Sequence, residues 1–145
     1  MKLTTKMRYG TRAMLDLALR YGQGPTTAKE IAERQGLSQK YLERLLVELQ
    51  AGGLVRAIRG SRGGYELATP PEAVTLLGIY RALEGSQGFV ECTVNPEVCE
   101  RSDFCVTQGV WAEMYRACMH ILEGTTLRDL VQRRHELHCA AMYYI

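Results

Sequence analysis

Apolar residues recur at helical spacing through the first part of the chain. Residues 3–21 are predicted to form an amphipathic helix, with Thr4 or Thr5 as its N-cap. The apolar residues of this helix are Leu3, Met7, Met14, Leu15, Leu17, Ala18 and Tyr21. The run "GQGP" at residues 22–25 is expected to end the helix. The chain therefore begins with a helix whose apolar face needs a packing partner.

Two shorter helical patterns follow, separated by a glycine. Thr26 or Thr27 is expected to cap a helix that runs to Arg34, and Gly36 supplies a tight turn before the next helix starts at Ser38. The apolar stripe of that next helix is Leu42, Leu45, Leu46 and Leu49. Gly52 and Gly53 are expected to end the helix. This pattern predicts a helix-turn-helix, whose second helix enters the major groove of DNA. A plain helical hairpin with a solvated face is the alternative.

A Gly- and Arg-rich stretch, "LVRAIRGSRGGYEL" at residues 54–67, comes next. Short strand signals at 54–55 and 65–67 flank a tip at 59–64, which predicts a β-hairpin. A hairpin after a recognition helix is a wing, whose arginines reach phosphates or the minor groove. The alternative is an ordinary hairpin with solvated arginines, but Arg56, Arg59 and Arg62 have no acidic neighbour, which favours the wing.

The candidate DNA contacts divide by chemistry. Those expected to reach phosphates or the minor groove are Lys40, Arg44, Arg59 and Arg62. Those expected to touch base edges are Ser38, Gln39 and Glu43. A carboxylate that faces DNA is costly unless it accepts a hydrogen bond, so Glu43 is expected to meet a cytosine N4 amino group.

The distribution of charge along the chain also supports DNA binding by its first part, although the net charge is only +2. Residues 2–62 carry twelve Lys/Arg against five Asp/Glu, and residues 63–145 carry six against eleven. The basic half is expected to contact nucleic acid. A chain of 145 residues fits one domain, and neither a membrane span nor a secretory signal is recognisable. We therefore expect a cytoplasmic protein with reduced thiols and no membrane partner.

Three of the five cysteines lie in the polar stretch "ECTVNPEVCERSDFC" at residues 91–105. Cys92, Cys99 and Cys105 have the spacing C-x6-C-x5-C on a segment expected to be irregular. Structural zinc sites use closer cysteine pairs, whereas an iron-sulfur cluster accepts wider spacing and a non-cysteine ligand at one corner. Three metal-free and redox-reactive loop thiols remain the alternative.

Three further helices are predicted after the wing: one at 71–84, a long one from Phe104 or Val106 to Glu123, and a short one from Thr125 or Thr126 to about Leu137. The apolar stripe of the long helix is Val110, Trp111, Met114, Tyr115, Cys118, Ile121 and Leu122. This stripe favours a homodimer, although it could also pack on the first helix. Cys118 is expected to be a buried small hydrophobe, and His135, His138 and Cys139 to be tail residues with little metal-binding role.

The predicted fold is mostly α with a small β-wing. It comprises a winged helix-turn-helix domain at 1–84, a cysteine cluster-binding loop at 85–105, and a dimerisation helix with C-terminal tail at 106–145. No nucleophile–base pair or phosphate-binding loop is present, so neither an enzyme nor a small-molecule substrate is expected.

The residues resemble the Rrf2 family of winged-helix bacterial regulators, particularly the IscR-type iron-sulfur cluster regulators. The resemblance covers almost the whole chain and rests on "MKLTTKMRYGTRAMLDLAL", on "LSQKYLERLLVELQAGGLVRAIRGSRGGYEL", and on the three cysteines followed by "VTQGVW". It implies a homodimer in which a cluster controls promoter choice. It also implies that Cys92, Cys99 and Cys105 are cluster ligands, Glu43 reads a base and Arg59 is the wing arginine.

One position departs from the family pattern. The histidine that serves as fourth ligand in IscR-type proteins is replaced here by Gln108, and an amide is a poor iron ligand. Either Gln108 coordinates weakly or another group substitutes for the histidine, and the candidates are Glu91, Asp103, His120 and a group from a partner subunit. A related branch uses an N-terminal aspartate for a 4Fe-4S cluster, but the matching region here offers Arg8. A 2Fe-2S cluster is therefore favoured, with 4Fe-4S still open.

The leading hypothesis is a cytoplasmic homodimeric regulator of promoter DNA that senses iron-sulfur cluster status. A cluster-free regulator of the same family, controlled by a partner protein or by thiol oxidation, is the alternative. An electron-transfer or cluster-carrier protein would leave the winged helix without a role.

Overall fold

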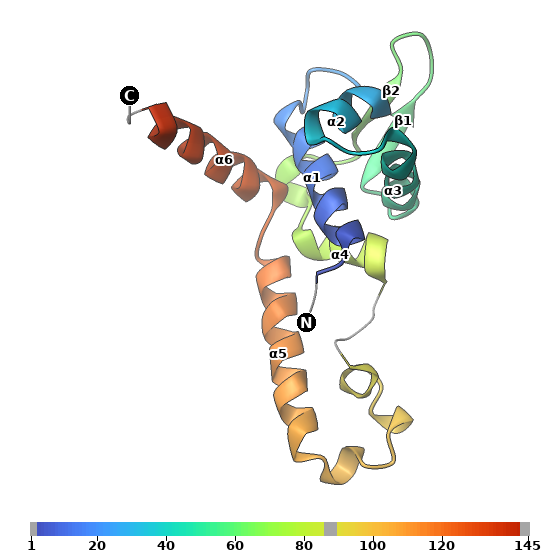
Figure 1. Ribbon diagram of the computed structural model, residues 1–145, viewed down its shortest axis with the longest axis vertical. Coiled ribbons are helices and arrows are strands. Elements are labelled where there is room, and N and C mark those ends of the chain that lie inside the picture. The colour runs from blue at the N-terminus through green and yellow to red at the C-terminus, as the bar shows by residue number, and fades with distance from the viewer. Residues whose placement is uncertain (1–2, 86–89, 143–145) are drawn as a thin grey trace.

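The computed structural model describes residues 3–85 and 90–142, with the side chains of residues 138 and 140–142 also left out. Within these ranges the fold is mostly helical with one two-stranded sheet, as predicted (Figure 1). The main elements are α1 (Thr5–Leu19), α2 (Ala28–Gln35), α3 (Gln39–Ala51), β1 (Val55–Ile58), β2 (Gly64–Leu67), α4 (Leu76–Glu84), α5 (Val106–Glu123) and α6 (Leu127–Met142). Three stretches of the predicted domains lie outside the described residues: residues 1–2, the "SQGF" run at 86–89, and residues 143–145.

Local capping signals fix the first helices. The Thr4 hydroxyl accepts a hydrogen bond from the backbone N–H of Met7 and begins α1. Thr27 and Glu30 form a complete capping box at the start of α2, and Gly36 ends that helix in the left-handed conformation, with φ 62°. The predicted helix at 3–21 is therefore shorter at both ends. Its outermost apolar residues, Leu3 and Tyr21, are exposed.

Replacing Thr27 with alanine is expected to lower the free energy of unfolding by about 1 kcal/mol, because α2 loses both halves of its capping box. Ser38→Ala is the matched control, since Ser38 is the N-cap of α3 but makes no side-chain capping hydrogen bond. Urea denaturation of both variants checks this. Equal losses in the two variants would contradict the role assigned to the box.

The core lies between α1, α2, α3, α4, the base of the wing and the start of α6. Its largest fully buried side chains are Met14, Ile31, Leu42, Leu45, Leu46, Leu49, Ile79, Leu127 and Val74. The predicted apolar stripe of the second helix-turn-helix helix is thus entirely buried, which leaves the opposite face of α3 to solvent. β1 and β2 pair antiparallel, with Val55 opposite Leu67, and form the predicted wing.

The helix predicted at 71–84 is interrupted. Pro71–Ala73 forms a single 3₁₀ turn, η1, and α4 starts only after Thr75. Thr75 is extended because it pairs with Thr126 in an isolated β-bridge, and its hydroxyl accepts a hydrogen bond from the N–H of Gly78. This bridge attaches the start of α4 to the start of α6, which explains the break.

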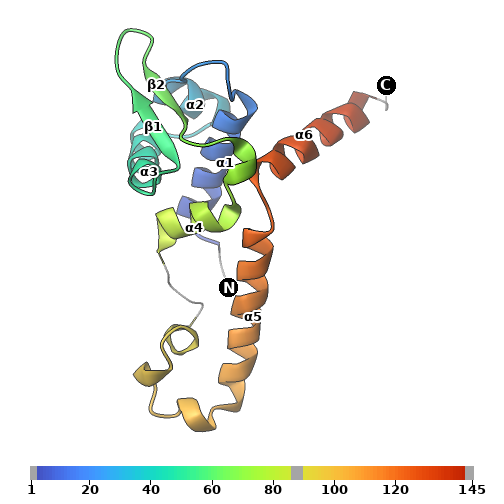
Figure 2. The same ribbon diagram turned by 180° about the vertical axis from the view of Figure 1, so that it is seen from behind.

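α5 projects from the winged-helix domain, and the cysteine segment, which precedes it in the chain, lies beside it (Figures 1 and 2). It contacts α4 and the first turn of the cysteine segment, and α6 is the helix that packs on α1. α6 runs to Met142, so the prediction of a short helix ending near Leu137 is wrong. No helix among the described residues is both long and apolar enough to cross a bilayer.

The apolar stripe of α5 is largely uncovered in the single chain. Val110, Met114 and Ile121 are exposed to 52%, 40% and 64%, and no residue of α5 is fully buried. Cys118 is only half-buried, so its expected full burial is not found within one chain. A face of this kind needs a second protein surface to remove it from water.

Candidate functional site

All five predicted contact residues of the helix-turn-helix lie on the solvent face at the start of α3. They are Ser38, Gln39, Lys40, Glu43 and Arg44, and each is exposed. The Gln39 side-chain amide donates a hydrogen bond of 2.9 Å to Glu43 Oε1. Two of the three candidate base readers are therefore linked to each other, one helical turn apart. This bond holds the Glu43 carboxylate on the exposed face before any DNA is present.

The start of α3 also has unused hydrogen-bonding capacity. Ser38 is the N-cap residue, yet its hydroxyl makes no capping bond to the helix. The backbone N–H groups of a helix's first turn have no intrahelical acceptors and attract anions. A free hydroxyl beside them is suited to a phosphate or a base edge.

The wing adds two further cations. Arg59 and Arg62 are exposed at its tip, whereas Arg56 is held in an ion pair of 2.7 Å with Glu66. Among residues 3–85 and 90–142, no carboxylate lies within ion-pair distance of Lys40, Arg44, Arg59 or Arg62. Of the three wing arginines, the two predicted as DNA contacts are thus the two that are free to bind phosphate.

Glycines shape the wing tip. Gly60 has a φ of 117°, a value that side chains other than glycine rarely adopt. A Cβ on Gly63 would lie 2.3 Å from the carbonyl oxygen of Ile58, so only glycine fits the turn. The tip is therefore narrow, which suits its insertion beside a duplex.

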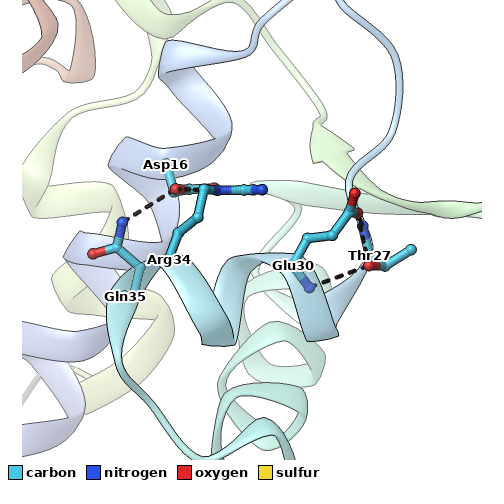
Figure 3. A network of polar contacts seen from close by, with 5 residues as sticks. All are labelled: Asp16, Thr27, Glu30, Arg34 and Gln35. Atoms are coloured by element: carbon cyan, nitrogen blue, oxygen red, sulfur yellow. Dashed lines mark hydrogen bonds and ion pairs between the residues drawn. The ribbon is translucent and has the colours of Figure 1, made fainter.

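A buried polar cluster positions α2 against α1 (Figure 3). Asp16 is only 4% exposed, and its carboxylate accepts hydrogen bonds from Arg34 Nη2 at 2.6 Å, Arg34 Nε at 3.0 Å and Gln35 Nε2 at 3.1 Å. The bond to Asp16 is the main cause that raises the pKa of the Arg34 guanidinium above its ordinary value. Arg12 also donates to the side chain and the carbonyl of Gln35. These contacts fix the helix that precedes the recognition helix.

This cluster was not predicted from the sequence. The available signal was Asp16 itself, a carboxylate between Leu15 and Leu17 on the apolar face of the first helix. A charge at such a position is buried only when it is paired. Arg34, in the last turn of α2, is that partner.

The cysteine segment consists of short 3₁₀ turns: η2 (Glu91–Thr93), η3 (Pro96–Val98) and η4 (Ser102–Phe104). Cys92 lies in the first turn, Cys99 ends the second, and Cys105 is the N-cap residue of α5. All three thiols are free and half-buried. The segment is irregular, as predicted.

The described structure does not gather these thiols into a metal site. No group of three or more His, Cys, Asp or Glu side chains within the described ranges is placed to hold a metal ion. The donor set suits iron-sulfur chemistry, since three free thiols lie on one irregular segment. The geometry is not assembled, so a cluster would require the turns to close around it.

Gln108 and Cys105 connect the segment to α5. Gln108 donates a hydrogen bond of 3.1 Å to the carbonyl oxygen of Cys92. Cys105 Sγ lies 3.2 Å from Thr107 Oγ1, and this contact is the main cause that lowers the pKa of the thiol, with help from the backbone N–H of Gln108. The start of α5 thus contacts both ends of the cysteine segment.

The candidates for a fourth ligand differ in position. Both carboxylate candidates are exposed: Glu91 directly precedes Cys92, and Asp103 lies two residues before Cys105. His120 lies in the last turn of α5, roughly 22 Å along the helix axis from Cys105 at 1.5 Å per residue. His120 of the same chain is therefore too distant to complete the site. His135 is exposed on α6, Cys139 is exposed near its end, and the side chain of His138 is outside the described part.

Comparison with known proteins gives a consistent result. The Rrf2 family model, described as an iron-dependent transcriptional regulator, matches residues 3–133. The transcriptional regulator CymR of Bacillus subtilis is 40% identical over 145 residues, which cover all of both chains. Its solved structure, described as the global cysteine regulator, has a TM-score of 0.78 over 92% of this chain and 98% of that one. The structure of T. potens IscR has a TM-score of 0.81 at 40% identity, over 99% and 97%.

Proposed function

The chain belongs to the Rrf2 family of transcriptional regulators, and from this premise we propose that it is a homodimer that binds promoter DNA and senses iron-sulfur cluster status. Its relatives are regulators rather than enzymes. It is IscR-like in fold and in sequence. The observation that carries the cluster proposal is the placement of three free thiols on one segment that leads directly into α5.

The exposed face of α3 and the wing support the proposed DNA-binding roles of individual residues. Lys40, Arg44, Arg59 and Arg62, which have no ion-pair partner among the described residues, would supply phosphate or minor-groove contacts and a salt-dependent affinity. The linked side chains of Gln39 and Glu43 would read base edges. The free Ser38 hydroxyl would contact either a phosphate or a base edge beside them.

Glu43→Ala is expected to lower the discrimination between the right and the wrong base by about 1–3 kcal/mol at one base pair, while nonspecific affinity is kept or raised. The reason is that a carboxylate repels phosphate but accepts a hydrogen bond from cytosine N4. Lys40→Ala is the contrasting variant, expected to weaken binding on every sequence and to reduce the salt dependence. Titrations on an operator, on single-base variants and on random DNA check both. An equal loss on all sequences for Glu43→Ala would contradict its role.

The cluster would be held by Cys92, Cys99 and Cys105, with 2Fe-2S favoured over 4Fe-4S. A bound cluster would hold the turns of the cysteine segment together. This closed arrangement would depend on the supply of iron and on the redox state. The fourth ligand would come from Glu91, Asp103, a weakly coordinating Gln108 or the partner subunit. Gln108 already spends its N–H₂ group on the carbonyl oxygen of Cys92, which leaves its Oε1 as the only atom able to coordinate.

Homodimer formation would cover the α5 stripe. The exposed Val110, Trp111 and Met114 form an apolar surface near the start of this helix, beside the cysteine segment. A two-fold dimer through α5 would place two α3 helices on one DNA face. The ordering of the cysteine segment would then bear directly on the dimer interface.

Contacts through α4 would carry a change from the cysteine segment to the recognition helix. Tyr80 on α4 and Tyr115 on α5 interact electrostatically. On its other side α4 meets α1 and α3 at two glycines: a Cβ on Gly10 would lie 2.3 Å from Leu83 Cδ1, and one on Gly52 would lie 2.6 Å from Ala82 Cβ. Cluster binding would shift the equilibrium between two arrangements of the cysteine segment, α4 and the recognition helix. The free energy of this shift could not exceed the difference in the cluster's binding free energy to the two arrangements.

A cluster-free regulator is the second candidate. It is favoured by the 40% identity to CymR over the whole chain, together with the dispersed positions of the three thiols. In that case a partner protein or thiol oxidation would control DNA binding.

Anaerobic purification followed by visible absorption and iron and sulfide analysis separates the two candidates. The cluster proposal expects a coloured protein with iron and sulfide at a fixed ratio to the chain. A colourless protein that stays iron-free after anaerobic reconstitution, yet binds promoter DNA, would favour the cluster-free regulator. A coloured protein that ignores promoter DNA would overturn both.

A further inference from the structure

A cationic pocket lies where α6 passes the C-terminal ends of α1 and α2. Its volume is about 310 Å³, and its lining residues are Asp16, Leu19, Arg20, Gln23, Arg34 and Arg134. Neither the DNA-contact residues nor the cysteine segment belong to it. Pockets of a few hundred cubic ångströms fit small molecules.

The one carboxylate in this lining is already neutralised. Asp16 uses both oxygens, accepting from Arg34 Nε and Nη2 and from Gln35 Nε2 (Figure 3). Arg34 in turn keeps its Nη1 group free of hydrogen bonds within the described residues. The Asp16–Arg34 pair therefore forms a neutral wall that still offers hydrogen-bond donors.

The remaining charged residues of the lining are both cations. In the part of the chain that the structure describes, Arg20 and Arg134 have no carboxylate within ion-pair distance. Arg20 affects Glu30 through its charge alone. Three guanidinium groups against one carboxylate leave the pocket with an excess of two positive charges.

The geometry of α6 directs Arg134 toward this pocket. Leu127 is fully buried, and Leu130 and Val131 pack against the core, so these residues define the face of α6 that meets α1. Arg134 follows Leu127 by seven residues, about two helical turns, and lies on the same face. A guanidinium thus occupies the position where the apolar stripe would continue, opposite two other guanidinium groups. Such like charges repel each other unless an anion lies between them.

The operator itself does not reach this pocket in the arrangement of the fold. Figures 1 and 2 both place α6 on the opposite side of α1 from α3 and the wing. Phosphates engaged by Lys40 or Arg59 therefore lie on the other face of the domain. The pocket needs a separate anion.

We propose that this pocket binds a small oxyanion with two or more negative charges, such as phosphate or a dicarboxylate, held by Arg20, Arg34 and Arg134. Guanidinium groups bind carboxylate and phosphate through paired charge-assisted hydrogen bonds. The bound anion ties α6 to the helix-turn-helix domain. This site is independent of whether the chain carries a cluster.

The test titrates inorganic phosphate, and separately malonate, into the full-length protein by calorimetry, with chloride keeping the ionic strength constant. At least one of the two oxyanions is expected to bind with one site per chain. Arg134→Gln and, from another helix, Arg20→Gln are each expected to weaken this binding by about tenfold or more, because each removes a charged hydrogen-bond donor. Arg133→Gln is the matched control, an exposed neighbour with the same charge change outside the lining, and is expected to bind as the unchanged protein does.

Three results would overturn the site. One is that neither oxyanion binds more strongly than chloride. Another is that Arg133→Gln loses as much binding as Arg134→Gln, which would indicate general charge attraction. The third is that Arg134→Gln weakens random DNA binding as much as Lys40→Gln does, which would make the pocket a DNA contact. Binding of phosphate alone or of malonate alone would support the site and identify the chemistry it prefers.

Discussion

Replacing Asp16 with alanine is expected to lower the free energy of unfolding by about 2–3 kcal/mol, and to weaken operator binding with it. The change removes the acceptor of Arg34 and Gln35 and leaves a guanidinium beside the core without its partner. This loss lies at or just below the usual range of about 3–5 kcal/mol for a broken buried pair, because the Arg34 side chain is 30% exposed and water can solvate it in part. Urea denaturation, followed by operator titration of the folded variant, measures both effects.

Glu33→Ala is the control for this prediction. Glu33 is also an acidic partner in an α2 ion pair, but its 3.9 Å contact with Lys29 joins side chains that are 65% and 72% exposed. A loss of less than about 0.5 kcal/mol is expected there. Should Asp16→Ala prove as mild as Glu33→Ala, the buried cluster would not be what holds α2 on α1.

Alanine at Cys92, Cys99 or Cys105 is expected to remove most or all of the iron from anaerobically purified protein. Under the cluster proposal, each change would take one of three sulfur ligands from a site without a fourth cysteine, so the remaining ligands would not hold a cluster. Promoter footprints of the triple variant are expected to match those of the apoprotein and to differ from those of the loaded protein. Iron analysis and footprinting with and without reconstitution measure the two effects.

Cys118→Ala and Cys139→Ala are the controls for ligand loss. Both residues are free cysteines outside the segment, on α5 and near the end of α6 respectively. They are expected to retain iron and the loaded footprint. If the triple variant gave the same footprints as the unchanged protein under every metal condition, cluster control of promoter choice would be wrong.

The helix-turn-helix and wing could be predicted because their signals are local. Thr27, Gly36 and Ser38 lie where the helices begin and end, and the stripe from Leu42 to Leu49 fixes which face of α3 is buried. Since the buried face is defined by the pattern, the exposed contact residues follow as its complement. The ion pair of Arg56 could not be predicted, because it depends on the strand register that places Arg56 opposite Glu66. The sequence alone therefore did not distinguish Arg56 from Arg59 and Arg62.

The features that escaped prediction depend on contacts between distant segments. The break before α4 comes from the pairing of Thr75 with Thr126, fifty-one positions later in the chain (126 minus 75). Asp16 is stabilised by residues of the next helix, which no periodicity reveals. The length of α6 escaped prediction because the sequence after Leu137 contains neither a glycine nor a proline to mark where the helix ends.

The cysteine segment could be predicted only in outline. Its proline and charges indicate irregular backbone, and its sulfur spacing indicates a class of ligand. The arrangement of the thiols depends on three short turns and on the bond from Gln108 to the Cys92 carbonyl, which lies sixteen positions away in sequence. Spacing alone carries no information about such a bond.

The contacts of α4 with Gly10 and Gly52 have a consequence for how variants of this protein would behave. A Cβ on Gly52 would meet the short Ala82 side chain, and one on Gly10 would meet the buried Leu83 side chain, so close packing leaves little room there for a change in spacing. A methyl group at either glycine would force α4 away from its neighbour in the core. If α4 carries the proposed signal, such a protein would keep both its cysteine segment and its DNA-binding face while losing the linkage between them, and its target genes would stay at a single level of expression.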